Sequence, residues 1–211
     1  MKIAIIGAGQ VGGALAVRLA RGGHEVVLAG SSQGSESVKK TLAREASLRA
    51  LPLREAVAAS EVVFLATPYA ANAGVVAELG EALDGKLLVD CTNPVGPGLS
   101  HGLKSETSGS AKLQESAPRA KVVKAFTIYG FENFEDSAYP GYGVKPAMLY
   151  CGNDGDAKAS VGALIAELGF EPVDVGGLEQ ALHLEHMTLL WVRMVRAKGR
   201  SPNLVWAALR R

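Results

Sequence analysis

The stretch KIAIIGAGQVG, residues 2–12, is the most informative part of this chain. Its apolar residues 3–6 suffice for one buried strand, and a helical pattern begins directly after the glycines. Gly7 permits a tight turn, Gly9 lets a pyrophosphate approach the backbone, and Gly12 lets the helix pack against the strand. The free N–H groups of a helix N-terminus attract phosphate. The stretch therefore predicts a dinucleotide-binding corner made of Gly7, Ala8, Gly9, Gln10, Val11 and Gly12. The alternative is a glycine-rich turn without a ligand.

The composition is that of a globular protein: of 211 residues, 48% are hydrophobic. A net charge of +1 does not favour nucleic acid or an anionic membrane as a partner. No apolar run approaches the roughly 18 residues needed to cross a bilayer, and Met1-Lys2 leads directly into the first strand, so we expect a cytoplasmic protein. Cys91 and Cys151 show no CxxC spacing and are expected to be buried free thiols rather than a redox pair.

Strand and helix patterns alternate, which predicts an α/β fold of the Rossmann type with a doubly wound, mostly parallel sheet. Further strands are expected at 24–28, 48–53, 61–66, 86–91, 121–126, 147–151 and 170–175. Helices are expected at 11–19, 70–83, 109–117, 154–168 and 178–198, and a last one from Ser201-Pro202. Residues 92–107 and 128–145 read as irregular. We expect a dinucleotide-binding domain over 1–145 and a small C-terminal α/β-helical extension over 146–211, with the acceptor site and a candidate dimer interface.

In such sheets, ligands bind beyond the carboxyl ends of the strands. Those ends carry residues 7–12, 30–32, 67–69, 92–94 and 127–130, which the topology predicts to converge on one crevice. The second strand ends without the Asp or Glu that usually accepts a hydrogen bond from the adenosine ribose of NAD. Ser31 and Ser32 can donate hydrogen bonds to a 2′-phosphate, and Lys39 or Lys40 can reach it from the next helix. The sequence therefore favours NADP over NAD.

The chain resembles the coenzyme F420-dependent NADP oxidoreductase family, whose fold is also that of the cytoplasmic domain of the STEAP ferric reductases. The resemblance covers nearly the whole chain and rests on GAGQVG (7–12), GHEVVLAGSS (23–32), ATP (66–68), DCTNPVGPGLS (90–100), VVKAF (122–126) and GFEPVDVGGL (169–178). Two positions depart from the family pattern: Ser32 stands where an arginine is common, and Thr127 stands where an asparagine is common.

The resemblance implies hydride transfer between NADP(H) and the deazaflavin coenzyme F420, with residues 7–12 around the pyrophosphate. The other residues that it implies are Ser31 and Ser32 for the 2′-phosphate, Thr67 and Pro68 for the ribose on the nicotinamide side, and Asn93, Pro94 and Ala125 for the nicotinamide pocket. Hydride transfer requires two rings held roughly 3–3.5 Å apart and shielded from water, rather than a protein acid or base. We therefore expect no single indispensable catalytic residue.

Several other side chains have two readings each. The aromatic residues Tyr129, Phe131 and Phe134 either form a flat wall for the acceptor ring or fill the junction below the C-terminal helices. His183 and His186 share a helix face but lack a clear third metal ligand, so we expect no metal site. These histidines either have a structural role or donate a proton into the crevice. His101 is expected to be solvated. The apolar surface of 178–198 is either a homodimer interface or simple core.

Three functions stay open from the sequence alone. The favoured one is an NADPH-dependent oxidoreductase whose small-molecule acceptor is a deazaflavin or a flavin-like ring. A reductase of small imines or carbonyls is the second, although that class usually has a longer helical C-terminal domain. The third is a sensor that binds NADP without catalysis, because hydride transfer leaves no catalytic signature in a sequence.

Overall fold

The computed structural model describes residues 1–30 and 34–211. In this part of the chain the strands form one eight-stranded sheet in the order β3-β2-β1-β4-β5-β6-β7-β8. All neighbouring strands are parallel except β6 and β7, which are antiparallel. The strands are β1 (Lys2–Ile6), β2 (Glu25–Ala29), β3 (Arg49–Leu51), β4 (Val62–Leu65), β5 (Leu87–Asp90), β6 (Lys121–Lys124), β7 (Ala147–Gly152) and β8 (Glu171–Asp174). The order of the first six is that of a doubly wound dinucleotide-binding sheet, so the predicted fold class is confirmed.

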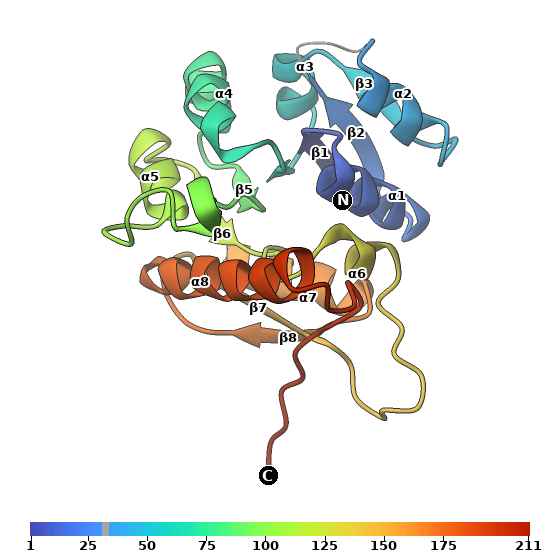
Figure 1. Cartoon of the computed structure of the whole chain (residues 1–211). Coiled ribbons are helices and arrows are strands. Elements are labelled where there is room, and N and C mark those ends of the chain that lie inside the picture. Colours follow the sequence, from blue (N-terminus) through green and yellow to red (C-terminus); the bar gives the residue numbers. More distant parts are fainter. Residues whose placement is uncertain (31–33) are drawn as a thin grey trace.

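Helices pack around the sheet, as Figure 1 shows. They are α1 (Gln10–Arg21), α2 (Glu36–Leu42), α3 (Leu53–Ala58), α4 (Asn72–Leu79), α5 (Gly109–Ser116), α6 (Phe131–Glu135), α7 (Gly155–Glu167) and α8 (Ala181–Val192). Helix α1 contacts α2 and α6, whereas α5 contacts α4 and α8. Short turns of 3₁₀-helix are η1 (Tyr69–Ala71), η2 (Gly80–Leu83), η3 (Pro97–Leu99) and η4 (Leu178–Gln180), and η5 (Arg193–Ala197) is a π-helical turn that extends α8. The division at residue 145 stays a prediction.

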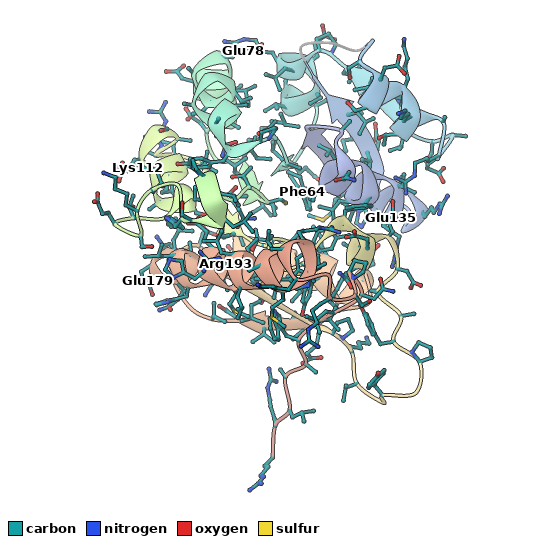
Figure 2. The ribbon with its side chains drawn as sticks, in the orientation of Figure 1. Phe64, Glu78, Lys112, Glu135, Glu179 and Arg193 are labelled. Atoms are coloured by element: carbon teal, nitrogen blue, oxygen red, sulfur yellow. The ribbon has the colours of Figure 1, made fainter. Side chains whose placement is uncertain are left out.

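The core follows from strands that are apolar on both faces, as parallel strands between helix layers must be. Strand β4 is buried along its whole length, and Phe64 has no exposed surface. Figure 2 places Phe64 in the interior, whereas the charged side chains of Glu78, Glu135 and Glu179 lie at the periphery. None of the helices in the described residues is long and apolar enough to traverse a bilayer.

Two short helices were not expected. Helix α3 follows Pro52 directly, and α6 lies inside the predicted irregular stretch 128–145. Both are shorter than two turns, so they carry too few residues for a helical period to show. The two cysteines are buried and free, as predicted. Burial raises the pKa of both thiols, to about 12 for Cys151.

The helix predicted from Ser201 is wrong, because residues 201–211 form no regular helix, and the end of the chain runs away from the body (Figure 1). The rest of the protein supplies the hydrogen bonds that a helix would have made internally. The carbonyl of Trp206 accepts from the Ala147 N–H at 2.8 Å, and the carbonyl of Leu204 accepts from Trp191 Nε1 at 2.7 Å. The tail is therefore held as an extended segment beside the start of β7.

The apolar face of 178–198 belongs mostly to the core of this chain. Leu189, Trp191 and Val195 are buried, whereas Leu190 is 50% exposed. The guanidinium of Arg196 lies 5.2 Å from the centre of the Trp191 ring and covers it. The homodimer stays a prediction.

The buried hydroxyl of Tyr129 anchors the tail, because it donates to the Ala147 carbonyl at 2.6 Å and accepts from the Trp206 N–H at 2.9 Å. Tyr129→Phe should leave these backbone groups without a partner and lower the free energy of unfolding by about 1–3 kcal/mol at pH 7. Urea unfolding measures this. Replacing Tyr142, which is 75% exposed, by Phe should leave the stability unchanged.

The same variant should change the alkaline limb of stability. Burial raises the pKa of Tyr129 in the folded state. The folded protein keeps this proton above pH ~10, where the unfolded chain loses it, so the free energy of unfolding falls as the pH rises. Tyr129→Phe should make the fall between pH 10 and 11 shallower; an unchanged slope contradicts the assignment.

Candidate functional site

The corner between β1 and α1 has glycine at the two positions where backbone segments approach most closely. Gly7 has φ +95°, and a Cβ there would lie 2.7 Å from the Ala66 carbonyl oxygen at the end of β4. A Cβ on Gly12 would overlap the Gly7 carbonyl oxygen. Both positions therefore require glycine, for the turn and for the approach of α1 to the β1–β4 edge.

Gly9 differs from these two glycines because an added Cβ meets nothing within 4 Å. Its φ is −71°, which any residue can adopt, so the fold does not need glycine here. Gly9 is the N-cap of α1, and within the described residues no side chain caps that helix. The first-turn N–H groups are left for another acceptor, and the space beside Gly9 is open. This combination suits a phosphate group.

The strands next to β1 bring the other predicted residues to the same edge. Ile6 pairs with Leu65, Leu65 with Asp90, and Asp90 with Lys124. Because these strands are parallel and their last residues pair with one another, the residues after them form a row beyond the carboxyl ends. The row contains the predicted residues Thr67 and Pro68 after β4, Asn93 and Pro94 after β5, and Ala125 after β6. Ser31 and Ser32 lie outside the described residues. The structure thus gathers the rest, and their ligand contacts stay a prediction.

The end of β6 is strained. Phe126 has φ +55°, which is rare for a bulky side chain, and it is fully buried between Phe64 and Phe134. Beside it, Ala125 is fully buried, and the hydroxyl of Thr127 is buried without a hydrogen-bond partner among the described residues. The backbone carbonyl of Thr127 accepts from the Thr188 hydroxyl of α8 at 3.0 Å. The strained backbone and the unpaired hydroxyl both follow β6 directly, next to the predicted site residue Ala125.

A cluster of buried charged side chains lies directly below this row. Lys124 is fully buried, and its ammonium lies 3.3 Å from Asp90 Oδ2 and 3.2 Å from Glu185 Oε1. Burial alone would lower the pKa of Lys124, but attraction to the two carboxylates outweighs it and the pKa is raised. Glu185 also accepts from the Gly109 N–H at 2.9 Å. The cluster therefore ties β5, β6, α5 and α8 together.

His101 completes this cluster, so the expectation that it is solvated is wrong. Its Nε2 lies 2.7 Å from Glu185 Oε2, and its side chain is 3% exposed. Its Nδ1 accepts from the N–H groups of Leu103 and Ser105, so Nε2 carries the proton. The sequence did hold a signal for the cluster, because Asp90 and Lys124 are charges within apolar strands. The sequence alone does not show that these two charges face one another.

Two of the predicted aromatic residues and one of the helix histidines contact other side chains of the protein. Tyr129 and Phe134 are buried and pack on Phe170, with ring centres 6.3 and 6.2 Å apart, which favours the packing reading. His183 is exposed, and His186 contacts the Ser105 hydroxyl at 3.0 Å.

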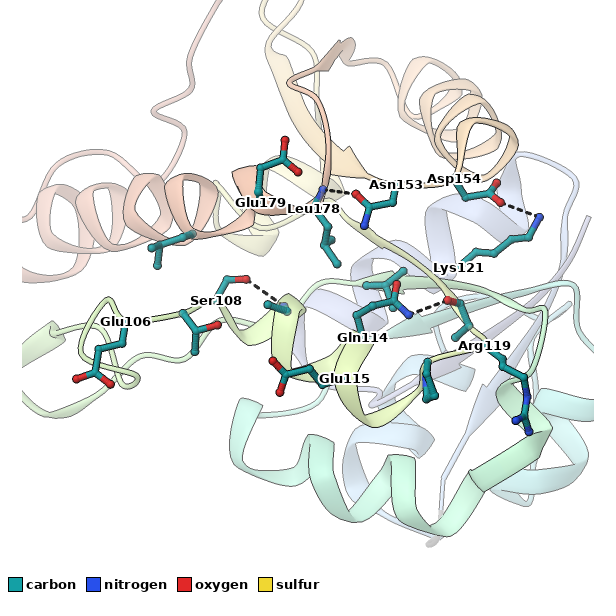
Figure 3. Close-up of a pocket in the computed structure, with 16 residues that line it drawn as sticks. Glu106, Ser108, Gln114, Glu115, Arg119, Lys121, Asn153, Asp154, Leu178 and Glu179 are labelled. Atoms are coloured by element: carbon teal, nitrogen blue, oxygen red, sulfur yellow. Dashed lines mark hydrogen bonds and ion pairs between the residues drawn. The ribbon is translucent and has the colours of Figure 1, made fainter.

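A cavity of about 870 Å³ lies along α5, between this helix and η4 (Figure 3). Several of its polar side chains already have partners within the protein. Lys121 pairs with Asp154 at 3.1 Å, and Asn153 accepts from the Leu178 N–H at 2.8 Å. The cavity opens beside the start of β6 rather than at the carboxyl row, so it is separate from the predicted nucleotide crevice.

Comparison with known proteins gives a consistent family. The family model described as NADP oxidoreductase, coenzyme F420-dependent, matches residues 2–94. An F420-dependent NADP reductase of Methanocaldococcus jannaschii is 29% identical in an alignment of 206 positions that covers 91% of each protein. A crystal structure of a proposed F420-dependent NADP-reductase from Arthrobacter sp. FB24 superposes with a TM-score of 0.85 at 29% identity and covers 94% of this chain and 95% of that one. Residues 2–94 thus match the coenzyme F420-dependent NADP oxidoreductase family, and the chain is similar along most of its length to F420-dependent NADP reductases.

These matches confirm the resemblance seen in the sequence. The metalloreductase STEAP3 of Rattus norvegicus is also related, with 31% identity over 189 residues. This match covers 89% of the chain but 36% of STEAP3, so the chain spans about a third of that relative. NADP and F420 are the cofactors of the family.

The buried cluster generates a stability prediction. Lys124→Met should leave Asp90 and Glu185 buried together without their cation and lower the free energy of unfolding by about 3–5 kcal/mol. Thermal or urea unfolding measures the loss. The matched control is Lys112→Met, because Lys112 is an exposed lysine paired with Glu115, and it should change stability little. Equal effects of the two substitutions would contradict the role of Lys124.

Proposed function

We propose that this protein is an NADP(H)-dependent oxidoreductase that transfers a hydride between the nicotinamide and a deazaflavin or flavin-like acceptor. The observation that carries the proposal is the bare corner at 7–12, where open space beside Gly9 meets the uncapped first turn of α1. The relatives that are F420-dependent NADP reductases support both the donor and the acceptor.

The residues of the corner fit a pyrophosphate. Residues 7–12 would hold it with backbone N–H groups at the N-terminus of α1, which complements its negative charge. Strand β2 ends at Ala29 and Gly30, with no carboxylate to repel a 2′-phosphate. Ser31 and Ser32 follow directly and would donate to that phosphate. These features support NADP over NAD.

The row after β4, β5 and β6 would hold the nicotinamide half. Thr67 and Pro68 would border its ribose, and Asn93, Pro94 and Ala125 would line its ring. NADPH supplies the hydride when bound. The work of these residues is to fix the position of the ring and keep water away, which is what hydride transfer asks of a protein.

Gly9→Ala tests the corner directly. The added methyl meets no protein atom, so the fold should persist, but it would stand where the pyrophosphate approaches the backbone. We expect the Kd for NADPH, measured by calorimetry, to rise at least about tenfold. The control is Gly74→Ala in α4, where an added Cβ also has open space, and it should bind NADPH as the wild type does. Unchanged binding by Gly9→Ala would contradict the proposed corner.

The acceptor is identified by following the nicotinamide absorbance of NADPH in the presence of coenzyme F420, FMN, FAD or a cyclic imine. We expect NADPH to be consumed with a deazaflavin or flavin-like ring. Consumption with the imine alone would instead support an imine reductase. Tight NADPH binding without consumption by any acceptor would support a sensor protein.

A further inference from the structure

A continuous line of hydrogen bonds leads from the buried charged cluster to the crevice. The Thr67 hydroxyl lies 2.9 Å from Asn72 Oδ1, Asn72 Nδ2 lies 2.8 Å from the Thr92 hydroxyl, and that hydroxyl lies 2.7 Å from Asp90 Oδ1. Asp90, Thr92 and Asn72 are buried, whereas Thr67 is half-buried at the row of carboxyl ends. The line therefore starts in the interior and ends where a ligand can reach it.

Asp90 fixes the direction of this line because it only accepts. Its Oδ1 accepts from the backbone N–H of Thr92 at 2.9 Å and from the Thr92 hydroxyl. Its Oδ2 accepts from the Ser110 hydroxyl and from the ammonium of Lys124. With donors on both oxygens, Asp90 is an acceptor toward every neighbour.

The direction then passes from residue to residue. Thr92 has one hydroxyl proton, and the close contact with Asp90 Oδ1 requires it, so toward Asn72 this oxygen can only accept. Asn72 must therefore turn its NH₂ group to Thr92 and its carbonyl oxygen to Thr67. Thr67 in turn donates its only hydroxyl proton to Asn72 Oδ1. The Thr67 oxygen is left with lone pairs and no proton to offer.

We propose that Asp90, acting through Thr92 and Asn72, holds the Thr67 hydroxyl as a hydrogen-bond acceptor that selects a ligand hydroxyl on the nicotinamide side of the crevice. A ribose hydroxyl can donate to Thr67, whereas a phosphate or carbonyl oxygen finds no proton there. This inference rests on the proposed function, because a dinucleotide whose pyrophosphate lies at β1 would place its second ribose beside the end of β4. Asp90, Thr92 and Asn72 are positioning residues, and Thr67 makes the contact.

The test is calorimetric titration of Thr92→Val with NADPH and with 2′,5′-ADP, which has the adenosine half of NADPH but no second ribose. Valine keeps the shape of threonine and removes the hydroxyl. We expect about fivefold weaker NADPH binding and less than twofold change for 2′,5′-ADP. Thr92→Ser, which retains the hydroxyl, should restore NADPH binding. Equal weakening of both ligands, or no restoration by serine, would show a merely structural role and overturn the inference.

A double-mutant cycle tests whether the effect passes through Thr67. In a Thr67→Val background, Thr92→Val should weaken NADPH binding no further, because the acceptor is already absent. Additive losses would overturn the inference. Should Thr92→Val not fold, Asn72→Ala interrupts the same line of hydrogen bonds while leaving Thr92 and Asp90 in place. It should give the same selective loss of NADPH affinity.

The two proposals fail differently. If the wild type binds NADPH and these variants bind it equally well, the inference is overturned and the proposed function stands. If the wild type binds no NADPH, both are overturned.

Discussion

The close approach of α1 to the carboxyl ends of β1 and β4 determines both the packing of the sheet and the shape of the predicted binding corner. It exists because no side chain stands at Gly7 or Gly12, where a Cβ would collide with backbone carbonyl oxygens. The same absence of side chains exposes the first-turn N–H groups of α1. A packing requirement and a binding surface therefore share one short stretch of backbone. In this corner Gly9 is the position that packing leaves free, and so its glycine is explained by a ligand.

The second constraint is electrostatic. Lys124, Asp90 and Glu185 are buried together, and such groups are costly to bury unless each has a partner. The hydroxyls and N–H groups around them complete the hydrogen bonding, which makes their geometry specific. Because Asp90 and Lys124 end the neighbouring strands β5 and β6, the cluster lies directly beside the crevice. The cluster fixes the loops that would hold the nicotinamide half of a dinucleotide.

Much of the fold was predictable from local patterns. The strands of the sheet, the corner at 7–12 and the row of carboxyl ends follow from apolar runs, glycine spacing and the rules of parallel sheets. The buried cluster was not predicted, because the mutual placement of Asp90, Lys124 and Glu185 depends on three elements far apart in the sequence. His101 was misjudged for the same reason: its loop has glycine and proline composition, and its partner lies 84 residues further along. The tail was misjudged because Tyr129 and β7 satisfy its backbone, which no local signal reveals.

The most direct test of the account is an NMR titration of the ¹⁵N-labelled protein with NADPH. A pyrophosphate at the bare corner changes the environment of the backbone amides at the start of α1 more than any others. We predict saturable binding with the largest amide shift changes in residues 8–12. Saturable binding that leaves these amides unchanged, or no binding at millimolar NADPH, would contradict it.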